Sequence, residues 1–166
     1  MLVSRHIAAL LLLALFTTTA RAQEEVRIEE PSYLDRQYMA SQRERLEELA
    51  AGRLGRTFTG ERDRDLETLQ LLLDRGLVRN DQTQMLQAMG VIMGDLLAAD
   101  LGMHWVIYED GLGRSRALRY RETDNYLYPI TMISRRREAG NLTPVADIYR
   151  KAFDIIAPLR TPGPFQ

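Results

Sequence analysis

The chain has no cysteine, and its 166 residues include only two histidines and one tryptophan. Without cysteine the fold has no disulfide and no thiolate metal site, so it must be held by core packing alone. His104 is the only histidine beyond residue 22, and a zinc site would need several carboxylates to converge on it. No serine lies in a G-x-S-x-G motif. We therefore identify no catalytic residue and expect no metal and no cofactor.

Long apolar runs are also scarce, and the longest lies at the amino terminus. Residues 7–16 are apolar and follow Arg5, but about ten residues are too few to cross a bilayer of roughly 30 Å as a helix. The triplet Ala20-Arg21-Ala22 fits the pattern recognised by signal peptidase. The sequence therefore predicts a signal peptide over residues 1–22, cleavage after Ala22, and a periplasmic protein without membrane insertion after cleavage.

Charge is distributed unevenly between the two halves of the predicted mature chain. Residues 23–110 contain 10 Arg and 18 Asp or Glu, a net of 10 − 18 = −8, whereas residues 111–166 contain 10 Lys or Arg and 5 Asp or Glu, a net of 10 − 5 = +5. The sum of −3 argues against nucleic-acid binding, which favours an overall positive domain. Three interpretations remain, which are attraction between the halves, head-to-tail self-association, and binding of an anion by the basic half. We favour the first.

The remaining pattern predicts one α+β domain over residues 32–157, between an acidic leader (23–31) and a flexible tail (158–166). Ser32 and Asp35 form a capping-box pattern for a first helix, and Gly76 is suited to end a second. A third helix begins near Asp81 and ends near Leu101. Gly90 and Gly94 are costly inside this helix, and close approach of another backbone would explain them. The apolar spacing then changes from that of a helix to that of strands, which predicts a hairpin at 103–121 packed on the helices.

The order of motifs in the carboxyl-terminal part resembles a known family. Trp105 on a strand, the Asp110-Gly111 turn, a basic second strand and the Tyr128-Pro129 step come first. Three arginines (135–137) and a last amphipathic helix follow. Over roughly residues 101–157 the chain resembles a proteobacterial family of exported proteins known only as a domain of unknown function. The resemblance implies an envelope location and an α+β fold, and it implies no reaction.

Two sets of acidic residues are compared with a calcium-binding loop and with a glycosidase site. Glu61, Asp63, Asp65 and Glu67 alternate with arginines, but a calcium loop that starts at Asp63 lacks the required glycine and glutamate. We attribute these acids to the start of a helix, where the helix dipole favours them. Asp95 and Asp100, on the most apolar helix, come closest to a carboxylate pair for sugar cleavage, although we expect them on its solvent-exposed edge.

The candidate binding surface combines arginine with aromatic residues around the hairpin. Arg114, Arg116, Arg119 and Arg121 follow one strand, and we expect alternate members on opposite faces. Arginine beside tyrosine or tryptophan is typical of interface hot spots and anion contacts. The alternative is that the arginines solvate the sheet and pair with the acidic half. The candidate ligand-binding residues are Trp105, Tyr108, Arg119, Arg121, Tyr128, Arg135 and Arg136.

These observations favour an interaction module without catalysis, binding an acidic protein or an anionic envelope polymer. Two alternatives stay open at this point. One is a small envelope hydrolase with paired carboxylates, and the other is an immunity-type inhibitor of a periplasmic toxin.

Overall fold

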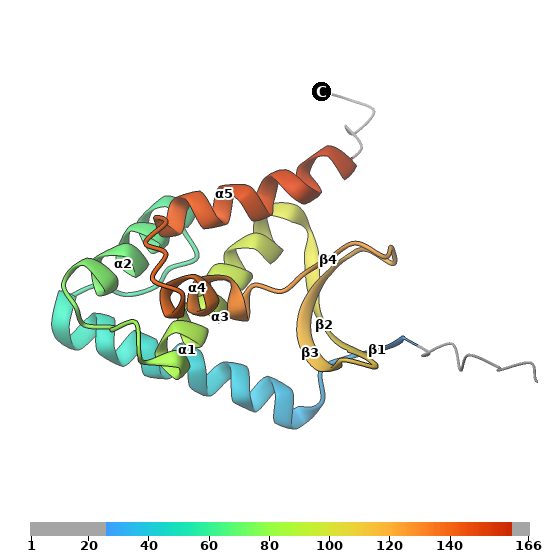
Figure 1. The fold of residues 1–166 in the computed structure, drawn as a ribbon, viewed down its shortest axis with the longest axis horizontal. Coiled ribbons are helices and arrows are strands. Elements are labelled where there is room, and N and C mark those ends of the chain that lie inside the picture. Colours follow the sequence, from blue (N-terminus) through green and yellow to red (C-terminus); the bar gives the residue numbers. More distant parts are fainter. Residues whose placement is uncertain (1–25, 161–166) are drawn as a thin grey trace, which may run out of the picture.

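The computed structural model describes residues 26–160, and within them five helices and a four-stranded antiparallel sheet form an α+β fold, as the sequence predicts (Figure 1). The predicted signal peptide and cleavage site lie outside the described residues, as does the end of the predicted tail. The helices are α1 (Tyr33–Leu54), α2 (Arg62–Asp74), α3 (Thr83–Leu101), α4 (Ile130–Glu138) and α5 (Val145–Ile156). The strands are β1 (Arg27–Glu29), β2 (Met103–Asp110), β3 (Gly113–Tyr120) and β4 (Tyr126–Leu127), in that spatial order.

The helix ends follow the local signals in the sequence. The Ser32 hydroxyl accepts a hydrogen bond from the Asp35 amide, and the Asp35 carboxylate accepts one from the Ser32 amide, which completes the capping box of α1. After α2, Gly76 takes a left-handed φ of 62°, and the Leu77 amide donates to the Leu72 carbonyl at 2.9 Å. These contacts satisfy backbone groups that a helix end leaves without a partner.

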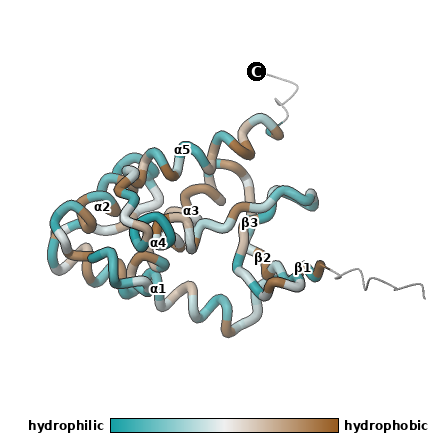
Figure 2. Tube along the Cα trace, in the orientation of Figure 1, coloured by the Kyte–Doolittle hydropathy of each residue, from teal (hydrophilic) through white to brown (hydrophobic). Residues whose placement is uncertain are grey.

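The core is built around α3, which α1, α4 and α5 cover together with the sheet (Figure 1). In Figure 2 the hydrophobic colour follows α3, whereas much of α1 is hydrophilic. Leu86, Met89, Met93 and Leu97 of α3 are fully buried. None of the described helices combines the length and the apolar composition needed to cross a bilayer.

The two interior glycines of α3 sit at close approaches, and the predicted approach of another backbone occurs at Gly90. A Cβ at Gly90 would lie 2.5 Å from the Ile130 carbonyl oxygen and 2.6 Å from the Pro129 carbonyl oxygen. A Cβ at Gly94 would lie 2.5 Å from the Trp105 ring. Backbone therefore touches α3 at Gly90, and an indole ring does so at Gly94. These contacts fix the start of α4 and the hairpin against one helix.

The chain ends of the domain differ from the prediction. Residues 27–29, expected within an acidic leader, form β1 and pair antiparallel with β2, for example Ile28 opposite Tyr108. The predicted tail begins as a 3₁₀ turn, Ala157–Leu159, and the Leu159 carbonyl accepts a hydrogen bond from the Tyr120 hydroxyl. Residues 27–29 and 157–159 have no apolar stripe of their own, and contacts with the rest of the domain hold both segments.

Candidate ligand-binding cleft

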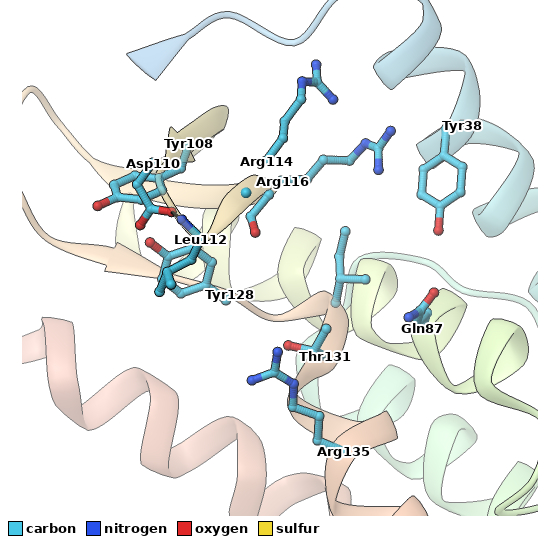
Figure 3. Close-up of a pocket in the computed structure, with 13 residues that line it drawn as sticks. Tyr38, Gln87, Tyr108, Asp110, Leu112, Arg114, Arg116, Tyr128, Thr131 and Arg135 are labelled. Atoms are coloured by element: carbon cyan, nitrogen blue, oxygen red, sulfur yellow. Dashed lines mark hydrogen bonds between the residues drawn. The ribbon is translucent and has the colours of Figure 1, made fainter. Parts of the chain in front are cut away.

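A cleft of about 580 Å³ opens where the edge of β3 faces the start of α4 and the side of α1 (Figure 3). Strand, loop and helix residues contribute to its wall. They are Tyr38, Gln87, Tyr108, Asp110, Leu112, Gly113, Arg114, Ser115, Arg116, Tyr128, Ile130, Thr131 and Arg135. Three arginines and three tyrosines thus meet at one place, from segments far apart in the sequence.

Asp35 is the buried anchor of the arginine side of the cleft. It is 2% exposed, and its carboxylate accepts hydrogen bonds from Arg114 at 2.7 and 3.0 Å. An Arg116 nitrogen lies 2.9 Å from the same carboxylate. The hydrogen bonds from Arg114, with those from Ser32, hold the pKa of Asp35 well below its usual range, although burial opposes them. The acidic half and the basic half of the chain are therefore paired here, as expected.

Arg116 is only partly satisfied by this carboxylate. Its guanidinium lies over the Tyr38 ring, 4.1 Å from the centroid, in a cation–π contact. Its Nε is buried and has no hydrogen-bond partner within residues 26–160, and 27% of its side chain stays exposed. A ring on one side and a carboxylate on the other hold the guanidinium in place, while part of the side chain remains accessible from the cleft.

Arg135 is the third arginine of the cleft, and unlike Arg114 and Arg116 it has no carboxylate partner among the described residues. It is exposed, and no acid of the described residues lies within ion-pair distance. Figure 3 shows its guanidinium extending from α4 beside Thr131. The cleft holds three guanidinium groups, and its carboxylates are Asp110 and the underlying Asp35, which gives 3 − 2 = +1. This region favours an anion.

The opposite wall is aromatic. Tyr108 packs edge to face with Tyr126 and with Tyr128, at centroid distances of 5.0 and 5.8 Å. Burial raises the pKa of Tyr128 and of Tyr126 above their usual value. These phenols therefore stay neutral at physiological pH. Tyr128 remains 37% exposed, so this wall presents both ring surface and hydroxyl groups that donate hydrogen bonds.

Of the seven candidate residues, the structure brings Tyr108, Tyr128 and Arg135 into this cleft. Trp105 instead packs on Gly94, and its indole N–H donates to Asp95 at 3.0 Å. The other three arginines also lie outside the cleft lining.

Each of those three arginines contacts a residue close to it in sequence. Arg119 donates to Glu122 at 2.7 Å and to the Thr123 carbonyl at 2.9 Å, and only 17% of its side chain is exposed. Arg121 follows the strand with a φ of 52° and lies over the Tyr120 ring. Arg136 donates to the Met132 carbonyl one turn earlier in α4.

Sequence reasoning omitted Tyr38, Arg114 and Arg116 from the candidate residues. The expectation that alternate strand arginines lie on opposite faces was wrong for Arg114 and Arg116, which are two residues apart and both reach Asp35. That spacing was the available signal for the pair. No local pattern indicates that Tyr38 on α1 would lie beneath β3.

A second cleft, of about 390 Å³, contains Glu44, Glu47, Asp65 and Asp95. Asp65 is 1% exposed and accepts hydrogen bonds from two loop amides, the nearer at 2.7 Å. Glu47 accepts from the Phe58 amide. Asp95 is held by two hydrogen bonds from Arg43, at 2.5 and 2.7 Å, and one from Trp105. Three of these four carboxylates thus connect a loop or a helix to the fold, and Asp65 explains part of the alternating acidic run.

Comparison with known proteins finds a similar fold and a family, but no activity. A crystal structure of a protein from Bacteroides thetaiotaomicron VPI-5482 matches 81% of this chain at 20% sequence identity and a TM-score of 0.71. This chain spans only 50% of that protein. No curated protein matches the sequence. The family described as domain of unknown function DUF3806 matches residues 65–149, from α2 into α5. The chain therefore belongs to the DUF3806 family.

Proposed function

We propose that this chain is an interaction module that holds an anionic ligand in the cleft between β3 and α4. The ligand is a segment of an acidic protein or an anionic envelope polymer. The observation that carries the proposal is that Arg116, fixed by Asp35 and Tyr38 yet 27% exposed, faces the same cleft as Arg135, which has no carboxylate partner among the described residues.

The chemistry of the walls supports binding. Arginine presents a planar set of donors that matches carboxylate and phosphate groups, and it stacks on aromatic rings. Tyr38 already fills one face of the Arg116 guanidinium, so its orientation is set before a ligand arrives. Tyr108 and Tyr128 add contact area at low conformational cost, because few side-chain torsions must be fixed.

The second cleft supports a hydrolase less well. Catalysis by paired carboxylates needs one acid to donate a proton and another to act as base or nucleophile. Asp65 and Asp95 are already occupied by loop amides and by Arg43. Losing either set of contacts during a reaction would open the loop or separate α1 from α3. We therefore favour binding.

The proposal is tested with residues 23–166 and two fluorescent probes, a capped oligoglutamate and an oligogalacturonate. We expect binding at low salt that weakens at high salt, because screening reduces exposed charge attraction. Arg135→Ala should weaken binding about tenfold, a typical effect for one charged hydrogen bond. Arg136→Ala is the matched control, since it removes the same charge from the next position of α4, outside the cleft. Equal losses for both variants would show general charge attraction and contradict the assignment of the cleft.

We further propose that the protein acts in the periplasm after removal of residues 1–22. The support is the short apolar run and the Ala20-Arg21-Ala22 triplet. Amino-terminal sequencing of the protein from a periplasmic extract should begin at Gln23. Intact protein starting at Met1 in that fraction would exclude cleavage.

A further inference from the structure

The edge of β3 that borders the cleft has no neighbouring strand among the described residues. β3 pairs with β2 over its full length, but with β4 only at Leu118 and Arg119. β4 ends at Leu127, because Pro129 has no N–H to donate to a ladder and leads into α4. The space where β4 would continue, beside residues 113–116, is the cleft (Figure 3).

The register identifies which backbone groups face this space. Asp110 pairs with Gly113 across a two-residue turn, which makes them a hydrogen-bonded pair. Hydrogen-bonded and non-hydrogen-bonded pairs then alternate along the hairpin. Ser115 therefore directs its N–H and C=O toward β2, whereas Arg114 and Arg116 direct theirs away from it. Residues 113–115 are exposed, so the edge is open to a partner.

We propose that an extended peptide, with acidic residues alternating with apolar ones, binds in the cleft as an added strand, antiparallel to β3 at Gly113–Arg116. This inference rests on the proposed anion-binding function and names its ligand. Backbone hydrogen bonds to Arg114 and Arg116 provide the affinity of strand addition, and side chains provide the specificity. An antiparallel strand continues the direction that β4 already has beside β3.

The two sides of the cleft dictate the alternation. Arg114 and Arg116 point to the face of the sheet that meets α1, where Asp35 and Tyr38 lie. Tyr108 pairs with Ser115 and therefore points to the opposite face, where it packs against Tyr128. Residues of an added strand alternate between these faces. One set thus meets guanidinium groups and the other meets aromatic rings.

Charge complementarity and the open ladder together select a polypeptide. A net of +1 in the cleft region attracts any anion, but only a peptide has N–H and C=O groups at the spacing of a strand. An anionic polysaccharide meets the first condition and not the second. The two classes are distinguished by whether binding depends on the ligand's backbone.

The test uses an acetylated, amide-capped octapeptide that alternates glutamate with valine, labelled with a fluorophore. In an antiparallel ladder, the residues opposite Arg114 and Arg116 share their face and direct their N–H groups at β3. These are the glutamates. N-methylation of the glutamate amides should weaken binding about tenfold or more. N-methylation of the valine amides is the matched control, because those groups face away from β3, and it should leave affinity nearly unchanged.

Each of the other outcomes contradicts a stated part of the proposal. If both methylated peptides bind as well as the parent, or if the valine series is the sensitive one, antiparallel strand addition is wrong, while the anion-binding function stands. If oligoglutamate binds and the alternating peptide does not, the proposed pattern is wrong. If neither binds at low salt, the proposed function fails as well. Two protein variants test whether the edge of β3 binds the peptide backbone. Both Arg114→Pro and Arg114→Ala remove the arginine side chain, but only Arg114→Ala keeps the backbone N–H, so Arg114→Pro should bind the peptide more weakly.

Discussion

Replacing Gly90 by alanine should destabilise the domain, although alanine is the better helix former. At an unobstructed helix position this change gains roughly 0.5–1 kcal/mol. At Gly90 the new methyl would lie 2.5 Å from the Ile130 carbonyl oxygen and 2.6 Å from the Ile130 Cα. Both obstacles are backbone atoms at the start of α4, so no side-chain rotation relieves the overlap. The helix must move instead.

The chain offers a matched control in Gly52, which lies within α1, where an added Cβ has no atom from outside its own helix backbone within 4 Å in the part of the chain that the structure describes. Overpacking costs about 1–3 kcal/mol, which exceeds the propensity gain. Gly90→Ala should therefore lower the free energy of unfolding, by about 0.5–2 kcal/mol after that gain is deducted. Gly52→Ala should raise it by roughly 0.5 kcal/mol. Urea denaturation followed by circular dichroism measures both.

The same substitution should also affect the cleft. Ile130 and Thr131 line it, and Arg135 follows one turn later on α4. A displaced α4 changes the position of Arg135 relative to Arg116, so Gly90→Ala should weaken oligoglutamate binding while Gly52→Ala leaves it unchanged. If Gly90→Ala is as stable as Gly52→Ala, the contact between α3 and α4 does not require a glycine at position 90.

Two further predictions concern buried charge. Because Arg114 lowers the pKa of Asp35, the unfolded chain takes up a proton at higher pH than the native one. The stability contributed by Asp35 should thus be complete above about pH 5 and decline as pH falls through 4 and below. The stability difference between the native chain and Asp35→Asn should shrink over that interval, and a constant difference in acid would contradict the reasoning. Arg137 is 8% exposed, with no hydrogen bond or ion pair to its guanidinium among residues 26–160, and its Nε is buried. Arg137→Met keeps the apolar stem and removes a desolvated cation, so thermal denaturation should show higher stability by about 1 kcal/mol or more, and a loss would mean that the guanidinium is compensated.

Much of the fold was predictable because its signals are local. The Ser32–Asp35 cap, the left-handed Gly76 and the hairpin turn each depend on residues within a few positions of one another. The helical glycines Gly90 and Gly94 were informative for another reason. Their cost is local and visible in sequence, while the compensating contact is distant. The sequence therefore predicted that something packs there without saying what.

The cleft was only partly predictable because its charges are assigned by tertiary pairing. The seven candidates were chosen because arginines and aromatic residues occur together in this part of the sequence. That pattern does not distinguish an arginine already paired within the fold from one available to a ligand. Arg119 is bonded within its own turn by Glu122, a partner three residues away that could have excluded it. Arg116 is held by Tyr38 on a distant helix, which no spacing rule connects to it. β1 was missed because three residues with little apolar surface become a strand only beside β2.

Asp35 takes part both in a local signal, the helix cap, and in the tertiary pairing that forms the cleft. As part of the capping box it helps to start α1, and as a buried carboxylate it pairs with both Arg114 and Arg116, which their two-residue spacing places on one face of β3. Two guanidinium groups side by side would otherwise repel each other, and one carboxylate between them offsets this while leaving a net positive charge. Because Arg116 is already fixed there, a ligand does not have to bear the entropic cost of ordering it. The acid in the helix cap thus preorganises the basic wall of the cleft, and the partner supplies carboxylates to the exposed part of Arg116 and to Arg135, which has no acid partner among residues 26–160.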